Sequence, residues 1–185
     1  IETRDGRSIV STLHAGWSLG AFGGALGVAV AAALGIDGVL EAVVVGVAIF
    51  VVWVELNPYY PMNQLLFKDT QESIWNPFDR FGDGALIAWV LVVVRIIGMT
   101  LIVPPLEEVF YRSLFYRYVI KYDFMKVPLG YFDGVALTIV ALTFGFMHYQ
   151  WLAGIICAVA YQWLVIRKNR LGDAMTAHAI TNFLL

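Results

Sequence analysis

The longest charge-free stretch of the sequence decides which kind of fold this chain can adopt. Between Ser8 and Ile36 there is no Asp, Glu, Lys or Arg, and His14 is the one ionisable side chain. A helix of roughly 20 apolar residues crosses the hydrocarbon core of a bilayer, which is about 30 Å thick. This charge-free stretch is longer than the apolar region of a signal peptide, which has a length of about 7–15 residues. An uncleaved span is therefore predicted, with cleavage at Ala29-Val30-Ala31 as the alternative.

The composition of the whole chain also indicates a membrane protein with several spans. Of the 185 residues, 60% are hydrophobic and 14% are charged, whereas soluble domains have about 45–50% apolar and about 25% charged residues. The net charge of −2 provides no cationic surface for nucleic acid. The single cysteine, Cys157, excludes an internal disulfide and a cysteine-rich metal site.

The apolar segments predict an all-α, polytopic helix bundle that forms one domain over residues 1–185. We expect about seven membrane segments, at about Ile9–Leu34, Gly38–Val54, Ala85–Val103, Leu106–Lys121, Gly134–His148, Trp151–Ile166 and Leu171–Leu185. Pro104-Pro105 is expected to break the chain between the third and the fourth segment. Residues 55–84 form a long loop that is predicted to lie in the membrane interface, and residues 85–185 form the helical core.

The distribution of Lys and Arg predicts the orientation in the membrane. Basic residues precede the first segment, occur in the long loop, follow the fourth segment and separate the sixth from the seventh. With seven spans all of these sites fall on one side, so the positive-inside rule predicts a cytoplasmic N-terminus. We expect the cytoplasmic membrane of a bacterium or an archaeon, with the polar groups of the last four segments in the outer half of the bilayer.

A small set of polar side chains falls inside the predicted segments of the helical core. These residues are Glu107, Glu108, Arg112, His148, His178 and Asn182. Ionisable groups inside a membrane are costly, and they commonly mark functional sites. The set therefore defines the candidate site.

The adjacent carboxylates Glu107 and Glu108 are expected to have different roles. Acidic residues in the first turn of a helix also favour its positive end, which is the purely structural explanation. Neighbouring side chains diverge by about 100° around a helix, however, so that explanation covers one of the two. Glu108 and Arg112 are four residues apart and can pair on one face. Glu107 has no such partner and is the candidate general base or acid.

Two histidines and an amide complete the candidate site. His148 ends the fifth segment, one turn after Phe144, and alone it would be read as an interfacial histidine. His178 and Asn182 are four residues apart on one face of the last segment, and alone they would be read as a hydrogen bond between helices. Together with the carboxylates these groups can activate water and stabilise an oxyanion, so catalysis is the favoured interpretation.

The order and spacing of these residues resemble a known family. Residues 107–112 match E-E-x-x-x-R, residues 144–148 match F-x-x-x-H, and residues 178–182 match H-x-x-x-N. In this order they resemble the CAAX protease and bacteriocin-processing (Abi) family of glutamate-type intramembrane proteases. The chain also looks similar to the bacterial branch associated with exosortase and sorting-signal systems. The resemblance covers residues 85–185.

The resemblance implies a role for each residue of the three motifs. Glu107 and His148 would bind and activate the attacking water, and His178 and Asn182 would form the oxyanion site. Glu108 and Arg112 would support the helix that carries Glu107. Phe144 belongs to the same pattern in a supporting role. No metal and no other cofactor is implied, and the partner would be a membrane-anchored protein or peptide cleaved near its C-terminal anchor.

Two alternatives remain open from the residues themselves. A zinc protease could use Glu107, His148 and His178 as ligands, because zinc accepts this combination of oxygen and nitrogen donors. A non-catalytic immunity or chaperone-like membrane protein could keep the motifs for packing. The oligomeric state and the identity of the substrate do not follow from the sequence.

Overall fold

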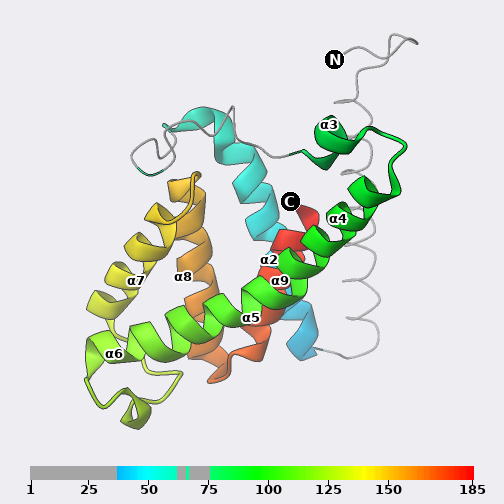
Figure 1. The fold of residues 1–185 in the computed structure, drawn as a ribbon. Helices are drawn as coiled ribbons and strands as arrows, with labels where there is room; N and C mark the ends of the chain where they lie inside the picture. The colour runs from blue at the N-terminus through cyan, green and yellow to red at the C-terminus, as the bar shows by residue number, and fades with distance from the viewer. Residues whose placement is uncertain (1–36, 62–65, 67–75) are drawn as a thin grey trace.

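The computed structural model describes residues 37–61, 66 and 76–185, and every regular element in them is helical (Figure 1). The elements are α2 (Asp37–Leu56), η1 (Asn57–Tyr59), α3 (Pro77–Phe81), α4 (Leu86–Ile97), η2 (Gly98–Ile102), α5 (Val103–Glu108), η3 (Val109–Phe115), α6 (Tyr116–Ile120), η4 (Phe124–Lys126), α7 (Gly134–Phe146), α8 (Trp151–Lys168) and α9 (Gly172–Leu184). The all-α prediction is confirmed for this part. The span predicted at Ile9–Leu34 lies outside the described residues, as do residues 62–65 and 67–75 of the predicted loop.

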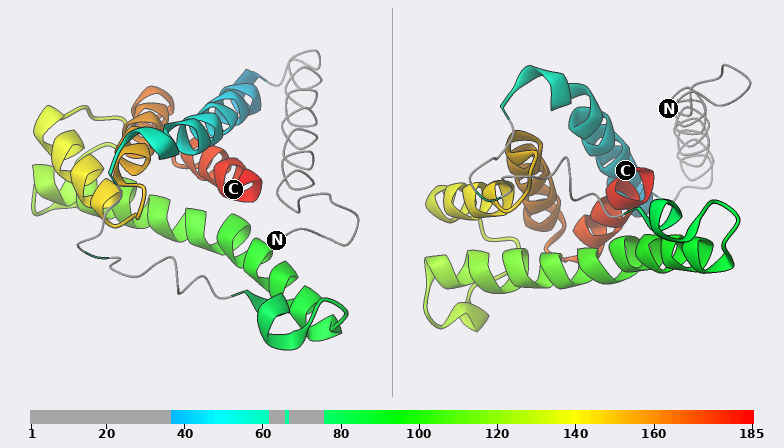
Figure 2. Two further views of the ribbon diagram at one scale, coloured as in Figure 1. Left: turned by 90° about the horizontal axis from the view of Figure 1, so that it is seen from above. Right: turned by 45° about the horizontal axis from the view of Figure 1, so that its top comes forward.

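The five elements from α4 to α6 form one uninterrupted helix, Leu86–Ile120, which we call the long helix. Figure 2 shows it running nearly straight across one side of the bundle. The predicted break at Pro104-Pro105 is therefore wrong, and the third and fourth predicted segments are a single helix. Prolines usually end or kink a helix, so this continuity needs a local explanation.

The turn before the two prolines provides that explanation. Residues Gly98–Ile102 form a π-helix, and the Val103 N–H bonds to the carbonyl of Gly98, five residues back. This wider turn leaves more room for a proline ring than an α-helical turn does. The carbonyl of Met99 accepts a hydrogen bond from Asn182 Nδ2 of α9, 2.9 Å away. A neighbouring helix thus satisfies a polar backbone group beside the prolines, as is common inside membranes.

Three helices of the described part are long and apolar enough to cross a membrane: Gly38–Tyr59, Leu86–Ile120 and Trp151–Lys168. The two remaining long segments of the core, α7 and α9, have 13 residues each, fewer than the roughly 20 that a full span needs. The prediction of about seven full spans is thus not confirmed. Large apolar side chains such as Leu86, Val94 and Leu101 point outward from the long helix, where lipid would cover them.

The other helices pack beside the long helix as two pairs. α2 packs along α9, and α7 packs along α8 as a hairpin. Gly46 of α2 lies so close to α9 that a Cβ there would be 2.6 Å from the carbonyl oxygen of Ala177. Gly154 of α8 faces Gly145 of α7 in the same way: a Cβ added at Gly154 would lie 2.9 Å from the Cα of Gly145. These glycines let the backbones approach closely, which stabilises helix pairs in lipid.

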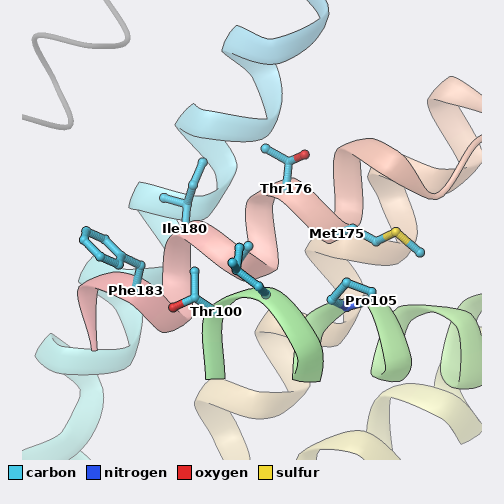
Figure 3. A pocket seen from close by; sticks show the side chains of 8 residues that line it. Thr100, Pro105, Met175, Thr176, Ile180 and Phe183 are labelled. Atoms are coloured by element: carbon cyan, nitrogen blue, oxygen red, sulfur yellow. The ribbon is translucent and has the colours of Figure 1, made fainter. Parts of the chain in front are cut away.

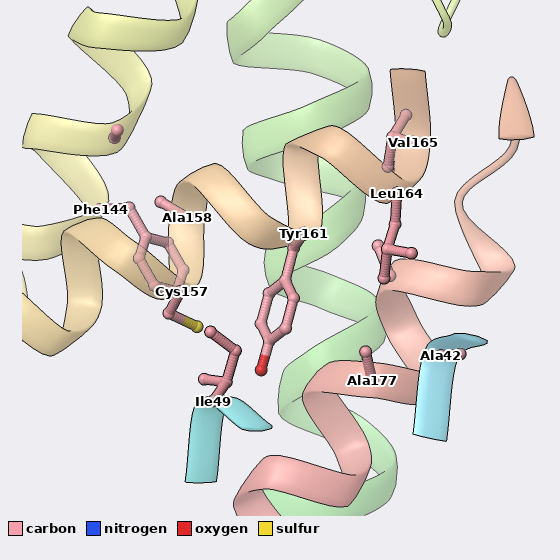
Figure 4. Close-up of a cluster of buried hydrophobic side chains, with 11 residues drawn as sticks. Ala42, Ile49, Phe144, Cys157, Ala158, Tyr161, Leu164, Val165 and Ala177 are labelled. Atoms are coloured by element: carbon pink, nitrogen blue, oxygen red, sulfur yellow. The ribbon is translucent and has the colours of Figure 1, made fainter. Parts of the chain in front are cut away.

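Large buried side chains fill the space between the two pairs. Figure 4 shows Tyr161 and Leu164 of α8, Phe144 of α7, Ile49 of α2 and Ala177 of α9 meeting in one cluster. Tyr161, Phe144 and Leu164 have no exposed surface. This cluster fixes how α7, α8 and α9 stand relative to one another, and so it also fixes the side chains that these helices direct toward the long helix.

The contacts at the two ends of the bundle correct the predicted topology. At one end, which we call the basic end, Glu41 at the start of α2 pairs with Arg167 and Lys168 at the end of α8. At the opposite end, Gln150 Nε2 donates to Asn57 Oδ1 over 2.6 Å. With seven spans, the start of α2 and the turn after α8 would lie on opposite sides of the membrane. That assignment is wrong because it counted the long helix as two spans.

Candidate active site

The two adjacent carboxylates lie near the middle of the long helix and differ in exposure. Glu108 is completely buried, whereas 31% of the Glu107 side chain is exposed. The cause is the helical turn between neighbours, which directs one side chain into the bundle and the other toward its edge. Glu107 is therefore the carboxylate that water or a substrate can reach, whereas the buried Glu108 is accessible to neither.

The predicted pair of Glu108 and Arg112 is present. Arg112 Nε lies 3.1 Å from Glu108 Oε2, and neither side chain has any exposed surface. The two groups attract by charge, but they are not aligned as a hydrogen bond, and Nη1 and Nη2 have no hydrogen-bond partner within the described residues. The guanidinium carbon also lies 5.0 Å from the ring centre of Phe144 and 5.8 Å from that of Tyr111. Aromatic faces thus supply part of the surroundings of this buried cation.

His178 of α9 contacts both carboxylates of the long helix. Its Nδ1 lies 2.9 Å from Glu108 Oε1, and its Nε2 lies 3.8 Å from Glu107 Oε2. Its ring stacks on Tyr161 of α8, with ring centres 5.1 Å apart, and meets the edge of Phe144 of α7 at 6.2 Å. Three other helices, the long helix, α7 and α8, therefore contact this one imidazole of α9.

His148 stands beside this cluster in the turn after α7. Its Nδ1 donates to the carbonyl of Phe144 over 2.7 Å, because a carbonyl oxygen can only accept. The Nε2 atom is therefore left as an acceptor. The ring of Trp53 of α2 meets His148 edge-on at 5.6 Å, and Phe144 lies against it at 4.5 Å. Within the described residues, Glu107 lies within ion-pair distance of His178 and not of His148.

Asn182 makes a contact that its motif did not predict. Its side-chain amide donates to the carbonyl of Met99 in the π-helical turn of the long helix. The structure therefore brings the E-E-x-x-x-R and H-x-x-x-N motifs together where His178 meets Glu107 and Glu108, and Asn182 contacts the long helix farther along, at Met99.

Two residues that no motif indicated also belong to the site. Tyr161 and Thr181 are both buried, and the Tyr161 hydroxyl donates to Thr181 Oγ1 over 2.7 Å. In the sequence, Tyr161 is one aromatic residue in an apolar helix. Its position beside His178 depends on how α8 packs on α9, which no local pattern encodes.

An apolar groove of about 340 Å³ runs between the long helix and α9 (Figure 3). Pro105 and Thr100 line one wall, and Thr176, Ile180 and Phe183 line the other. None of the candidate catalytic side chains lines it, although Pro105 is two residues from Glu107. The groove is therefore a neighbour of the site and not part of it.

The described residues contain no group of three or more His, Cys, Asp or Glu side chains arranged to hold a metal ion. Glu107 and His178 lie close together, but the third candidate ligand, His148, does not join them in such a group. The zinc alternative therefore has no preformed set of ligands in this part of the chain.

Comparison with known proteins identifies the family. Residues 88–184, more than half of the chain, match the family model described as type II CAAX prenyl endopeptidase Rce1-like. The chain belongs to this family. The resemblance to CAAX proteases is thereby confirmed, and with it an integral membrane protein of the intramembrane protease type. No curated protein and no solved structure matches the chain.

Proposed function

We propose that the protein is a glutamate-type intramembrane endopeptidase that cleaves membrane-tethered proteins near their C-terminal anchors. The observation that carries this proposal is the contrast between Glu107, which is partly exposed, and Glu108, which is buried against Arg112. A general base must reach the attacking water, and its support must hold it in place. The family supplies the reaction class, because its members are prenyl endopeptidases by description.

In the proposed mechanism Glu107 removes a proton from water, whose oxygen attacks the scissile carbonyl. His148 directs its free Nε2 atom, an acceptor, toward the same water. His178 and Asn182 stabilise the oxyanion that forms. Glu108 and Arg112 support the catalytic turn, and Phe144 packs against both histidines. The apolar surroundings strengthen each of these charge interactions.

The test compares membranes that contain the wild-type protein with membranes that contain Glu107→Gln. New C-termini of membrane-anchored proteins, measured by mass spectrometry of protein ends, should appear with the wild type alone. An internally quenched, farnesylated peptide that ends in a CAAX sequence is the parallel probe for prenylated substrates. Identical sets of protein ends in both membranes, with normal insertion of both proteins, would favour the non-catalytic alternative.

A zinc protease remains the second candidate, for one reason. Both histidines have Nδ1 held by an oxygen acceptor, Phe144 O for His148 and Glu108 Oε1 for His178. Metal-binding histidines are commonly fixed in this way, with Nε2 free for the ion. Activity that is lost on chelation and restored by zinc, with one zinc per chain in the purified protein, would decide for this candidate.

We also propose an orientation in which the basic end faces the cytoplasm. Arg167, Lys168 and Arg170 lie there, and the positive-inside rule assigns such a cluster to the cytoplasmic side. The turn with His148 is then on the extracytoplasmic side, which suits exported substrates. In this orientation a span at Ile9–Leu34 would place the N-terminus outside, which conflicts with the cytoplasmic N-terminus predicted from the sequence.

Single cysteines test this orientation directly. Met125→Cys, in the turn after the long helix, and Tyr59→Cys, beyond α2, are both at well-exposed positions. In a Cys157→Ala background, an impermeant thiol reagent should label Cys at position 59 in intact cells. Position 125 should react only after the membrane is opened, and the reverse result would contradict the proposed orientation.

A further inference from the structure

The Nδ1 atom of His178 contacts Glu108, and Glu108 in turn pairs with Arg112. The buried guanidinium lies 3.1 Å from one oxygen of Glu108, and the other oxygen lies 2.9 Å from His178 Nδ1. A carboxylate that faces a permanent cation is ionised, and an ionised carboxylate can only accept hydrogen bonds. The proton between Glu108 and His178 therefore belongs to Nδ1. This fixes the tautomer of the ring and leaves Nε2 toward Glu107.

The same imidazole is held across its face by Tyr161. The two rings stack at an interplanar angle of 30° with centres 5.1 Å apart. The Tyr161 hydroxyl donates to Thr181 Oγ1, which in turn lies 2.9 Å from the carbonyl of Gly46 and 3.0 Å from that of Ala177. Tyr161 is thus anchored to α2 and α9 at once. Rotation of the His178 ring would require this buried network to move.

We propose that Glu108 and Tyr161 are positioning residues that hold His178 in one orientation and one tautomer, with Nδ1 protonated and Nε2 facing Glu107. The inference rests on the proposed function for its catalytic meaning, but the tautomer itself can be measured without a substrate. The proposal gives Glu108 a different role: it orients His178, whereas the family resemblance implied only that it supports the helix that carries Glu107. It also adds Tyr161, which belongs to none of the three motifs.

This tautomer decides how His178 can act. A neutral ring with its proton on Nδ1 has only a lone pair at Nε2, so it donates to an oxyanion only after Nε2 gains a proton. Glu107, whose Oε2 lies 3.8 Å from Nε2, can supply the proton that it has removed from the attacking water. Nε2 then passes this proton to the amine leaving group as the carbon–nitrogen bond breaks. Both side chains return to their starting states.

The first test is nitrogen NMR of the purified full-length protein with ¹⁵N-labelled imidazole rings. The signals of His178 are assigned by their absence in His178→Gln. We expect the neutral ring of His178 to carry its proton on Nδ1, the atom that faces Glu108. Glu108→Gln should yield a mixture of both tautomers. A neutral wild-type ring with its proton on Nε2, or an unchanged tautomer in Glu108→Gln, would overturn the proposal.

The second test separates the ring of Tyr161 from its hydroxyl. Tyr161→Phe keeps the stacked ring but loses the hydrogen bond that anchors it to Thr181, so its kcat should fall less than that of Tyr161→Leu. Tyr161→Leu removes the ring, so kcat should fall about 10–100-fold with KM unchanged, as is typical when a group that orients a catalytic residue is lost. Its His178 spectrum should also show both tautomers. An unchanged spectrum and unchanged kcat in Tyr161→Leu would exclude a positioning role.

Leu164→Ala is the matched control for this series. Leu164 is fully buried on the same helix and in the same cluster, but it has no aromatic ring that could stack on His178. This variant should lose stability while the His178 spectrum keeps the wild-type tautomer. If the wild type shows the expected tautomer and yet cleaves neither the farnesylated peptide nor any membrane protein, the proposed function fails and the positioning role stands.

Discussion

Glu107→Ala, His148→Ala and His178→Ala are each expected to lower kcat by several orders of magnitude in the purified protein. Residues that act as one catalytic unit show effects of this size, and double variants should lose little more than single ones. The measurement is steady-state cleavage of a substrate found among the new protein ends, or of the farnesylated peptide. Glu107→Ala and His148→Ala should still insert and unfold cooperatively, because neither side chain is fully buried.

Glu55→Ala is the matched control for the loss of a carboxylate. Glu55 is an exposed residue near the end of α2, outside the candidate site. Its replacement should leave kcat near the wild-type value. Turnover near that of the wild type in Glu107→Ala would contradict the glutamate mechanism, whatever the other two variants show.

Arg112→Ala is expected to destabilise the protein by about 3–5 kcal/mol, because it leaves Glu108 as a buried charge without its cation. Asn182→Ala, which removes a hydrogen bond at a partly exposed position, should cost about 1 kcal/mol. The free energy of unfolding in mild detergent, measured with a denaturant, checks both values.

A double variant distinguishes the ion pair from simple loss of packing. Arg112→Met combined with Glu108→Gln removes both charges and keeps much of the side-chain volume. It should be more stable than Arg112→Met alone, because no unpaired charge remains in the core. If Arg112→Ala is as stable as the wild type and inactive, Arg112 takes part in the chemistry instead.

The sequence was sufficient to predict an all-helical membrane protein and the family to which it belongs. Charge-free segments identify membrane helices without any knowledge of their partners, since the bilayer imposes this pattern on each helix separately. The pair of Glu108 and Arg112 was also predictable, because residues four apart share a face of any helix. Both predictions depend on local spacing alone.

The errors arose where the outcome depends on contacts between helices. Pro104-Pro105 indicates a break by local rules, but the π-helical turn and the amide of Asn182 let the long helix continue. That one error reversed the predicted side of α2 relative to the basic end. Tyr161 was missed for a similar reason, since its stacking on His178 follows from the packing of α8 on α9.

The π-helical turn at Gly98–Ile102 has a consequence for how this helix tolerates changes in length. A π turn holds one residue more than an α turn. The side chains before the turn are therefore rotated about the helix axis, relative to those after it, compared with a regular α-helix. Loss of one residue within the turn could be absorbed by a return to α-helical bonding, with the part from Glu107 to Ile120 left in place. The part of the long helix before this turn can therefore change in length by one residue while the distance between Glu107 and His178 is preserved.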